Sequence, residues 1–214
     1  MPTTEIGIVR TADQGLTDQS LQVATLDKSG ALVVMDFFAK AVLDGHGYEL
    51  RAGTISVPLV GDVAITDTAA EYAINPGSGK VIIPLYQKIT TNLGTGTLFE
   101  YATKAVLGAS SGTAFVLLPM NGTGQRAAVS TGHVAAAGGV TVSAELATTT
   151  RVLWSAGQPI AMGAYVIEGA WEPLRPVKVV AGDSIYTQIA ATTTGPSYFA
   201  TFDVLEMGTG QIGG

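Results

Sequence analysis

Cysteine is absent from this chain, so it has no disulfide framework and no metal site built from thiolates. A chain of 214 residues can bury a sizeable core without such cross-links, so their absence leaves no gap in stability. A cysteine-free composition is compatible with an intracellular origin. The length fits either one large all-β domain or two small domains.

Charged residues are also scarce. They make up 13% of the chain, compared with about 25% in an ordinary soluble domain, and the mean hydropathy is +0.36. Much of the surface must therefore be formed by threonine, serine, glycine and alanine, which pack against copies of themselves with little desolvation cost. The composition favours a subunit of a symmetric assembly, and a monomer with a threonine-rich surface is the alternative.

Basic residues are too few and too scattered to form a nucleic-acid surface. The 11 lysines and arginines make no cluster, and the formal net charge is −6. The first residues, MPTTEIGIVR, lack the charged-then-apolar order of a signal peptide. The longest apolar stretch, Ala31–Leu43, is interrupted by Asp36 and Lys40 and is too short to span a bilayer. We therefore expect no direct nucleic-acid partner and no membrane partner.

Short segments rich in β-forming residues recur along the chain between turns of glycine, proline and asparagine. They predict about eight to ten strands in an all-β sandwich or barrel, and the lack of alternating long helices disfavours a parallel sheet. After the turn at Gly45–Gly47, the first two predicted strands are Tyr48–Pro58 and Asp62–Thr66. Residues 1–30 are predicted to form an extended arm, residues 31–207 the β domain, and residues 208–214 a flexible glycine-rich end.

The strongest strand signal lies near the end of the chain. Alternation with a period of two runs through residues 185–190 and 198–205, on either side of the connection Ala191–Pro196. A short connection that contains glycine predicts a hairpin. Aromatic residues on both faces indicate strands in the middle of a sandwich, or a face covered by a second subunit. The residues predicted to lie in the core or in an interface are Tyr186, Ile189, Tyr198, Phe199, Phe202 and Leu205.

Two local features carry predictions of their own. Ala31–Leu43 fits a buried helix or a buried strand, and Asp36 as N-cap with a stop at Asp44-Gly45 favours a short helix of about two turns. Pro84 interrupts the segment Lys80–Thr90 and cannot donate to a strand ladder, which predicts an edge strand or a bulge there.

Candidate catalytic residues are weak. Gly182-Asp183-Ser184 would suit a nucleophilic serine only if a histidine base lay within hydrogen-bond reach. The two histidines, His46 and His133, have no recognisable context, and the same tripeptide is ordinary turn chemistry. Glycine strings such as Gly94-Thr95-Gly96 lack the GK[ST] ending of a phosphate loop and are interpreted as turns.

Candidate ligand-binding residues are equally sparse. Asp62 and Asp67 could join an oxygen-ligated calcium site, although their spacing matches no calcium loop. Trp154 and Trp171 could form a platform for a sugar ring, but tryptophan in a sandwich lies more often in the core or an interface. We expect no enzyme activity, no cofactor and no bound metal.

Three stretches give the chain a resemblance to a known class of proteins. They are SGALVVMDFFAKAVLDGHGYELRAGT at Ser29–Thr54, VIIPLYQKI at Val81–Ile89 and VKVVAGDSIYTQIAATTTGPSYFATFDVLEM at Val177–Met207. Their layout resembles that of jelly-roll structural proteins of bacteriophage virions, which occur as capsid shell or decoration subunits. The glycine turn before SIYTQI and the aromatic last strand are also similar to trimeric TNF/C1q-like sandwiches, in which the last hairpin lies near the threefold axis.

The resemblance implies a single antiparallel jelly-roll sandwich at residues 31–207 in a non-enzymatic virion component that forms homotrimers. It implies synthesis in the host cytoplasm, a place in the outer layer of the capsid and contacts with other capsid proteins. The chain lacks a basic arm and the long helix of tailed-phage shell proteins, which favours a decoration or cement role. A receptor- or carbohydrate-binding fibre head and a hydrolase on a β-scaffold are the alternatives.

Overall fold

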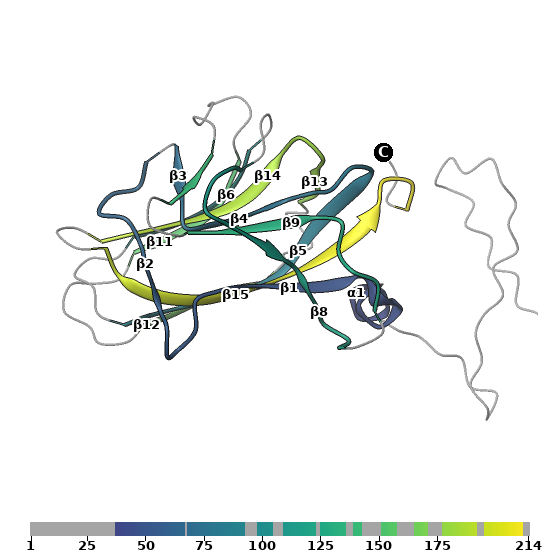
Figure 1. Ribbon diagram of the computed structural model, residues 1–214, viewed down its shortest axis with the longest axis horizontal. Coiled ribbons are helices and arrows are strands. Elements are labelled where there is room, and N and C mark those ends of the chain that lie inside the picture. The colour runs from purple at the N-terminus through teal and green to yellow at the C-terminus, as the bar shows by residue number, and fades with distance from the viewer. Residues whose placement is uncertain are drawn as a thin grey trace, which may run out of the picture. The chain divides into compact units, whose positions relative to one another are not determined.

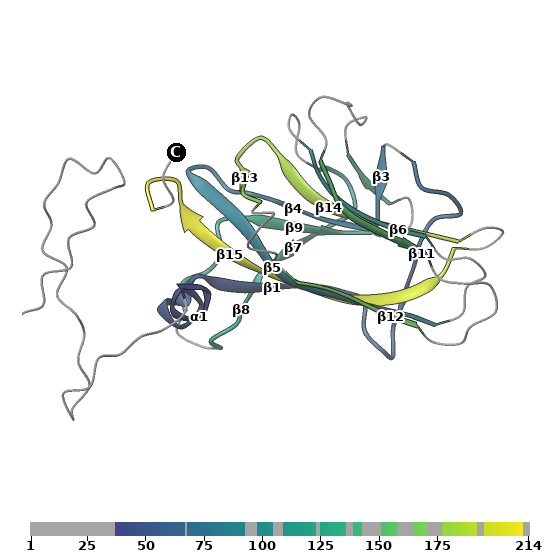
Figure 2. The same cartoon turned by 180° about the vertical axis from the view of Figure 1, so that it is seen from behind.

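The computed structural model describes residues 37–66, 68–92, 98–104, 109–122, 125–135, 139–142, 151–157, 165–170, 177–191 and 195–211. These residues form antiparallel β-sheets and a single short helical segment, which confirms the prediction of an all-β sandwich (Figures 1 and 2). The predicted arm at residues 1–30 lies outside the described residues.

The chain divides into two compact units, Met1–Lys40 and Ala41–Gly214. In the first unit, the rings of Phe37 and Phe38 meet edge to face in helix α1 (Phe37–Ala41), with centroids 5.3 Å apart. In the second unit, the π-helical turn η1 (Val42–His46) contains Gly45 at a φ of +87°. The short helix expected here therefore forms, while its predicted N-cap, Asp36, lies outside the described residues.

Two stacked sheets make up most of the second unit (Figure 1). The seven-stranded sheet runs in the order β12-β5-β15-β1-β8, with β13 beside β5 and β2 beside β15, and the six-stranded sheet runs β11-β6-β14-β4-β9-β7. A separate pair joins β3 to β10. The strands are β1 (Gly47–Ala52), β2 (Leu59–Val60), β3 (Ala69–Ala70), β4 (Tyr72–Asn75), β5 (Lys80–Asn92), β6 (Leu98–Lys104), β7 (Thr113–Val116), β8 (Leu118–Pro119), β9 (Thr131–Val134), β10 (Val140–Thr141), β11 (Arg151–Gly157), β12 (Tyr165–Ala170), β13 (Val179–Val180), β14 (Ser184–Ala190) and β15 (Ser197–Gly208).

Four nested pairs organise the main strands of the sandwich. β1 pairs with β15, β4 with β14, β5 with β12 and β6 with β11, all antiparallel. In chain order the first main strand thus lies beside the last, and each following strand pairs with one nearer the middle of the chain. The first and third pairs belong to one sheet and the second and fourth to the other, so most connections carry the chain from sheet to sheet.

This nesting corrects the predicted terminal hairpin. β14 and β15 do not pair with each other, because β14 lies between β6 and β4 in the six-stranded sheet and β15 between β5 and β1 in the other. The connection Ala191–Pro196 crosses between sheets that pack about 10 Å apart, and its residues 192–194 lie outside the described part. Alternation identified both strands correctly but carries no information about their partners.

Two of the predicted segments differ from the observed strands. The predicted strand Tyr48–Pro58 ends at Ala52, because Gly53 turns the backbone with a φ of +70°. The predicted strand Asp62–Thr66 does not form, and Asp62 makes only an isolated bridge with Ala190.

Pro84 predicts either an edge strand or a bulge, and the structure shows the bulge. β5 is an interior strand, and its pairing with β15 shifts register so that Asp203 faces Tyr86 while Val204 faces Pro84. Leu85 therefore has no partner across the ladder. The extra residue accommodates the proline that a regular ladder could not accept.

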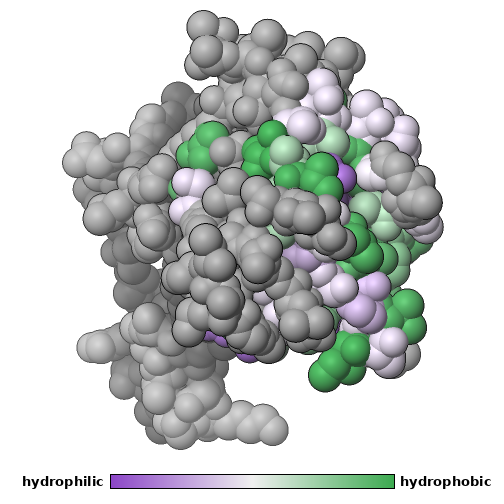
Figure 3. Space-filling model, turned by 90° about the vertical axis from the view of Figure 1, so that its left-hand side faces the viewer, coloured by the Kyte–Doolittle hydropathy of each residue, from purple (hydrophilic) through white to green (hydrophobic). Residues whose placement is uncertain are grey.

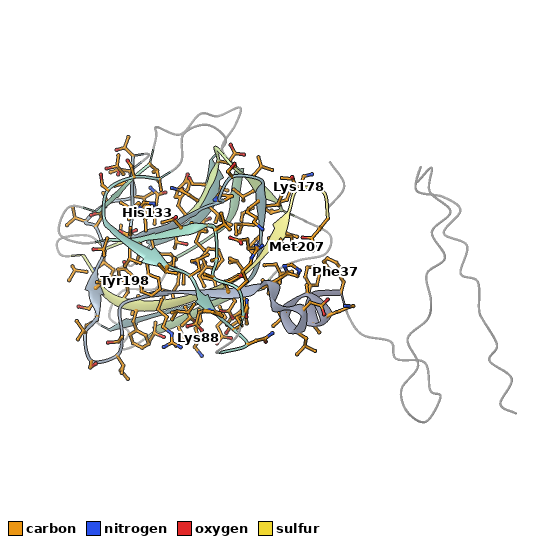
Figure 4. All side chains as sticks on the ribbon, turned by 45° about the vertical axis from the view of Figure 1, so that its right-hand side comes forward. Phe37, Lys88, His133, Lys178, Tyr198 and Met207 are labelled. Carbon is orange, nitrogen blue, oxygen red and sulfur yellow. The ribbon has the colours of Figure 1, made fainter. Side chains whose placement is uncertain are left out.

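Side chains from both sheets fill the space between them (Figure 4). The ring of Tyr72 lies 6.3 Å from that of Tyr198 and 6.5 Å from that of Phe202, measured between centroids. Gln87 on one sheet donates through Nε2 to the hydroxyls of Tyr72 and Thr187 on the other, each at 2.6 Å. The sheets are thus joined by apolar packing and by buried hydrogen bonds.

A second small core covers the outer face of β14. Tyr186 is fully buried there among Ala70, Ala73, Val140 and a few other small residues, several of them on or beside the β3–β10 pair. Both faces of β14 are consequently shielded from water, as the aromatic and aliphatic residues on both of its faces indicate.

We predict that Ile189→Val destabilises the fold by about 1 kcal/mol, because the lost methylene leaves a cavity in the main core. Val63→Ala shortens a side chain that is 59% exposed and should change the free energy of unfolding by less than about 0.5 kcal/mol. Urea denaturation of both variants measures the difference. Equal effects would place Ile189 outside the core.

Candidate interaction surface

Five of the six residues predicted for the core or an interface are fully buried within one chain. Tyr186, Ile189, Tyr198, Phe202 and Leu205 are at most 1% exposed, whereas Phe199 is partly exposed on the outer face of the seven-stranded sheet. Figure 4 shows Tyr198 within the sandwich. A contact between copies at this sheet would therefore involve Phe199 and not the other five.

The geometry does not bring a histidine to Ser184. Its hydroxyl is buried and has no hydrogen-bond partner. His46 Nδ1 lies 3.2 Å from the carbonyl oxygen of Glu206, and His133 bonds Asn75 and the carbonyl of Ser111. Asp183 instead closes a turn by donating its N–H to Val180 O at 3.0 Å. The tripeptide is therefore a turn that leads into β14.

The remaining sequence candidates receive little support from the described residues. Within these, no group of three or more histidine, aspartate or glutamate side chains could hold a metal ion. Asp67 and Trp171 lie outside the described part, and Trp154 is placed only as a backbone position in β11. Gly94-Thr95-Gly96 also lies outside it.

Glu206 is a buried carboxylate that holds a loop against the sheet. Its Oε2 accepts the backbone N–H of Ser130 at 2.6 Å and that of Val129 at 2.9 Å. The Lys80 ammonium lies 3.9 Å and the Arg126 guanidinium 3.5 Å from Oε1. This one side chain fixes the segment that leads into β9.

Glu71 is a second buried carboxyl and lies where β4 stops pairing with β14. Its Oε2 accepts the Ile189 N–H at 2.6 Å, and its Oε1 accepts the Asp62 N–H at 3.1 Å. Burial raises the pKa of Glu71 to about 8, while the two backbone donors act in the opposite direction and nearby Asp62 adds to the rise. The side chain thus satisfies backbone groups that a neighbouring strand would otherwise satisfy.

The outer face of the seven-stranded sheet carries two ion pairs. Lys88 bonds Glu168 at 3.0 Å across β5 and β12, and Arg51 pairs with Glu49 along β1. Asp203 lies directly opposite Glu49, and partial burial, with a smaller contribution from the Glu49 charge, raises the pKa of Asp203 to about 6. Charged side chains of β1, β5, β12 and β15 therefore meet on this face.

Exposed aliphatic residues lie instead on the loop between β1 and β2, Gly53–Pro58, which we call the finger. It projects away from the sandwich on the side of the seven-stranded sheet (Figures 1 and 2). Thr54 and Val57 exchange backbone hydrogen bonds of 3.0 and 3.2 Å, so the tip is a closed turn. Ile55 is 78% and Val57 68% exposed, and Val60 just beyond is 63% exposed. The end of the molecule that carries the finger shows several separate hydrophobic areas in green (Figure 3).

Glycine is required at the base of the finger. Gly53 has a φ of +70°, and a Cβ at this position would lie 3.1 Å from the backbone nitrogen of Leu59. Any side chain at this position would be strained by the positive φ and would require Leu59 to shift, so glycine is favoured where the two legs of the finger meet. The finger is held by backbone geometry and its own hydrogen bonds, which makes its apolar tip a preformed feature.

A second apolar patch surrounds the start of β1, and we call it the basal patch: Leu43, Leu118 and Met120. Their side chains are 63%, 39% and 40% exposed. The segments are tied together, because Met120 N–H donates to Gly47 O at 3.0 Å and Asn121 Nδ2 donates to Leu43 O at 3.1 Å. The finger and the basal patch thus lie at opposite ends of β1.

Sequence reasoning missed the finger, the basal patch and both buried carboxyls. For the finger a signal exists, since Ala52–Gly61 reads AGTISVPLVG, with no charge and with glycine and proline inside an apolar segment. For Glu71 and Glu206 no local signal exists, because their partners lie far away in the sequence.

No described helix is long and apolar enough to cross a membrane. No family model, curated protein or solved structure matches this chain.

Proposed function

We propose that this chain is a non-enzymatic structural subunit of a bacteriophage virion, a decoration or cement protein of the jelly-roll type that forms trimers on the outer surface of the capsid. The observation that carries the proposal is the uncharged finger, on which Ile55 and Val57 are largely exposed in a chain with few charges. Exposed aliphatic side chains on a preformed element are typical of an interaction site.

The nested strand order supports the jelly-roll part of the proposal. Pairing of β1 with β15, β4 with β14, β5 with β12 and β6 with β11 gives two four-stranded layers, as in a long hairpin rolled into a sandwich. A fold by itself does not specify a function, so the virion role rests on the resemblance of the three stretches and on the surface described above.

The virion role is tested by purifying virus particles on a density gradient from a lysate of the cells that make this chain. We expect peptide mass spectrometry to find the chain in the particle fraction, in a fixed ratio to the main shell protein. A chain found only among free proteins of the lysate would contradict the proposal. Deleting its gene should leave particles that form but break at lower temperature or under osmotic shock.

A further inference from the structure

We infer that copies of this chain associate head to tail, with the finger of one copy inserted against the basal patch of the next. The inference rests on the proposed function, because it assigns the contact through which the subunits would assemble. It names Ile55 and Val57 on one side and Leu43, Leu118 and Met120 on the other.

The distribution of exposed apolar side chains is the first reason. Each copy carries two separate clusters at opposite ends of β1, a strand of six residues that spans about 20 Å. A face that paired with its own equivalent around a twofold axis would need only one cluster. Two different clusters in each copy fit a heterologous contact, which closes into a ring when the rotation between copies allows it.

The charge distribution is the second reason and favours another copy as the occupant. Each chain has a formal net charge of −6, so two copies repel wherever their acidic residues face each other. Glu49 borders the basal patch, because it lies opposite Leu118 in the ladder between β1 and β8. The stretch Ala52–Gly61 contains no charged residue, so a finger can approach this acidic border without repulsion.

The size of the contact is the third reason. Two or three aliphatic side chains on each partner make a surface well below the roughly 800 Å² per partner of a standard stable interface. A single finger-to-patch contact would therefore be weak. A closed ring uses both elements of every subunit, and the last contact forms at a high effective concentration.

The contact is tested first by charge substitution on the finger. The double variant Ile55→Asp with Val57→Asp should shift the mass in light scattering from the oligomer to the single chain and leave the melting temperature within a few degrees of the wild type. Val152→Asp is the matched control, since Val152 is an exposed aliphatic residue on β11 of the other sheet, and its oligomer should persist. An unchanged oligomer in the finger variant would overturn the inference.

Cross-linking then identifies the partner of the finger. Because the chain has no cysteine, Ile55→Cys and Leu43→Cys each introduce a single thiol. A short bismaleimide should link the two variants when they are mixed, with one carrying a size tag, and should link neither variant to itself. Self-linking of Ile55→Cys would indicate a symmetric contact, and an oligomer that gives no mixed product would exclude the basal patch, so either result overturns the inference.

Failure of the virion role is seen separately, as absence of the chain from purified particles, and failure of self-association gives a further distinct result. A wild-type chain that is monomeric at every concentration contradicts self-association itself, before any variant is made. Wild-type protein that binds phosphatidylcholine vesicles through the finger, with loss of binding in the Asp variant, would make lipid the partner and overturn the head-to-tail contact.

Discussion

Glu206→Ala should lower the free energy of unfolding by about 5 kcal/mol, the largest effect that we expect from a single substitution in this protein. Glu206 lies near the end of β15, and its buried carboxylate accepts hydrogen bonds from the N–H groups of Val129 and Ser130. Removing it leaves two backbone donors without their acceptor and the mostly buried Lys80 ammonium without its counter-charge. Each of these groups is costly to bury unpaired.

The measurement is thermal unfolding followed by circular dichroism. For a chain of this size a loss of about 5 kcal/mol corresponds to roughly 10–20 °C in the melting temperature. Glu168→Ala is the matched control, because Glu168 pairs with Lys88 in an exposed ion pair and solvent screening makes the contribution of such pairs to stability small. Equal shifts in the two variants would contradict the anchoring role of Glu206.

The stability of the wild-type protein should fall as the pH rises from about 4.5 to about 8, because Glu71 has a pKa of about 8 in the folded chain and 4.5 without its surroundings. Between these values the folded chain keeps a proton that the unfolded chain has released, so raising the pH favours unfolding. The contribution of Glu71 is fully present below pH 4.5 and is lost by about pH 8. It amounts to about 4 kcal/mol over the whole window.

Glu71→Gln tests this assignment. The variant cannot ionise, so its stability should stay level between pH 6 and pH 8, where the wild type declines. At pH 4.5 it should be about 1 kcal/mol less stable, because an amide offers one acceptor oxygen to the two N–H groups of Asp62 and Ile189. Urea midpoints measured at intervals of one pH unit give both slopes.

Asp203 provides the control for the pH dependence. Its pKa is also raised, to about 6 from 3.8, so its contribution is lost at lower pH than that of Glu71. Asp203→Asn should make the decline between pH 4 and pH 6 less steep, with the Glu71 part above pH 4.5 remaining, and should leave the decline between pH 6 and pH 8 nearly unchanged. If the decline above pH 6 persists in Glu71→Gln, Glu71 is not its source.

Local patterns predict the elements of this fold well. The period-two alternation at residues 185–190 and 198–205 locates β14 and β15, and FFAKAVL with the stop at Gly45 locates the helical segment. Pro84 predicts the irregularity in the ladder, because a residue without an N–H cannot continue a regular pairing. In each case the cause lies within a few residues of its effect.

The sequence does not indicate which strands pair, or which residues far apart in the chain form hydrogen bonds. The partners of β14 and β15 are chosen by how two sheets bury their faces together, and Ile185 and Phe202 meet in one core although they belong to different sheets. From the sequence, Glu71 cannot be distinguished from a surface glutamate, because Ile189, which donates its N–H to it, lies far along the chain. The composition of Tyr48–Pro58 predicts one strand that includes most of the finger, whereas the positive φ of Gly53 ends the strand before it.

The most direct test of self-association is the mass of the wild-type protein in solution, measured by size-exclusion chromatography with light scattering over a range of concentrations. We predict the mass of three chains of 21.9 kDa each, with a retention volume that does not change on dilution into the low micromolar range. A single 21.9 kDa species at every concentration would contradict the account.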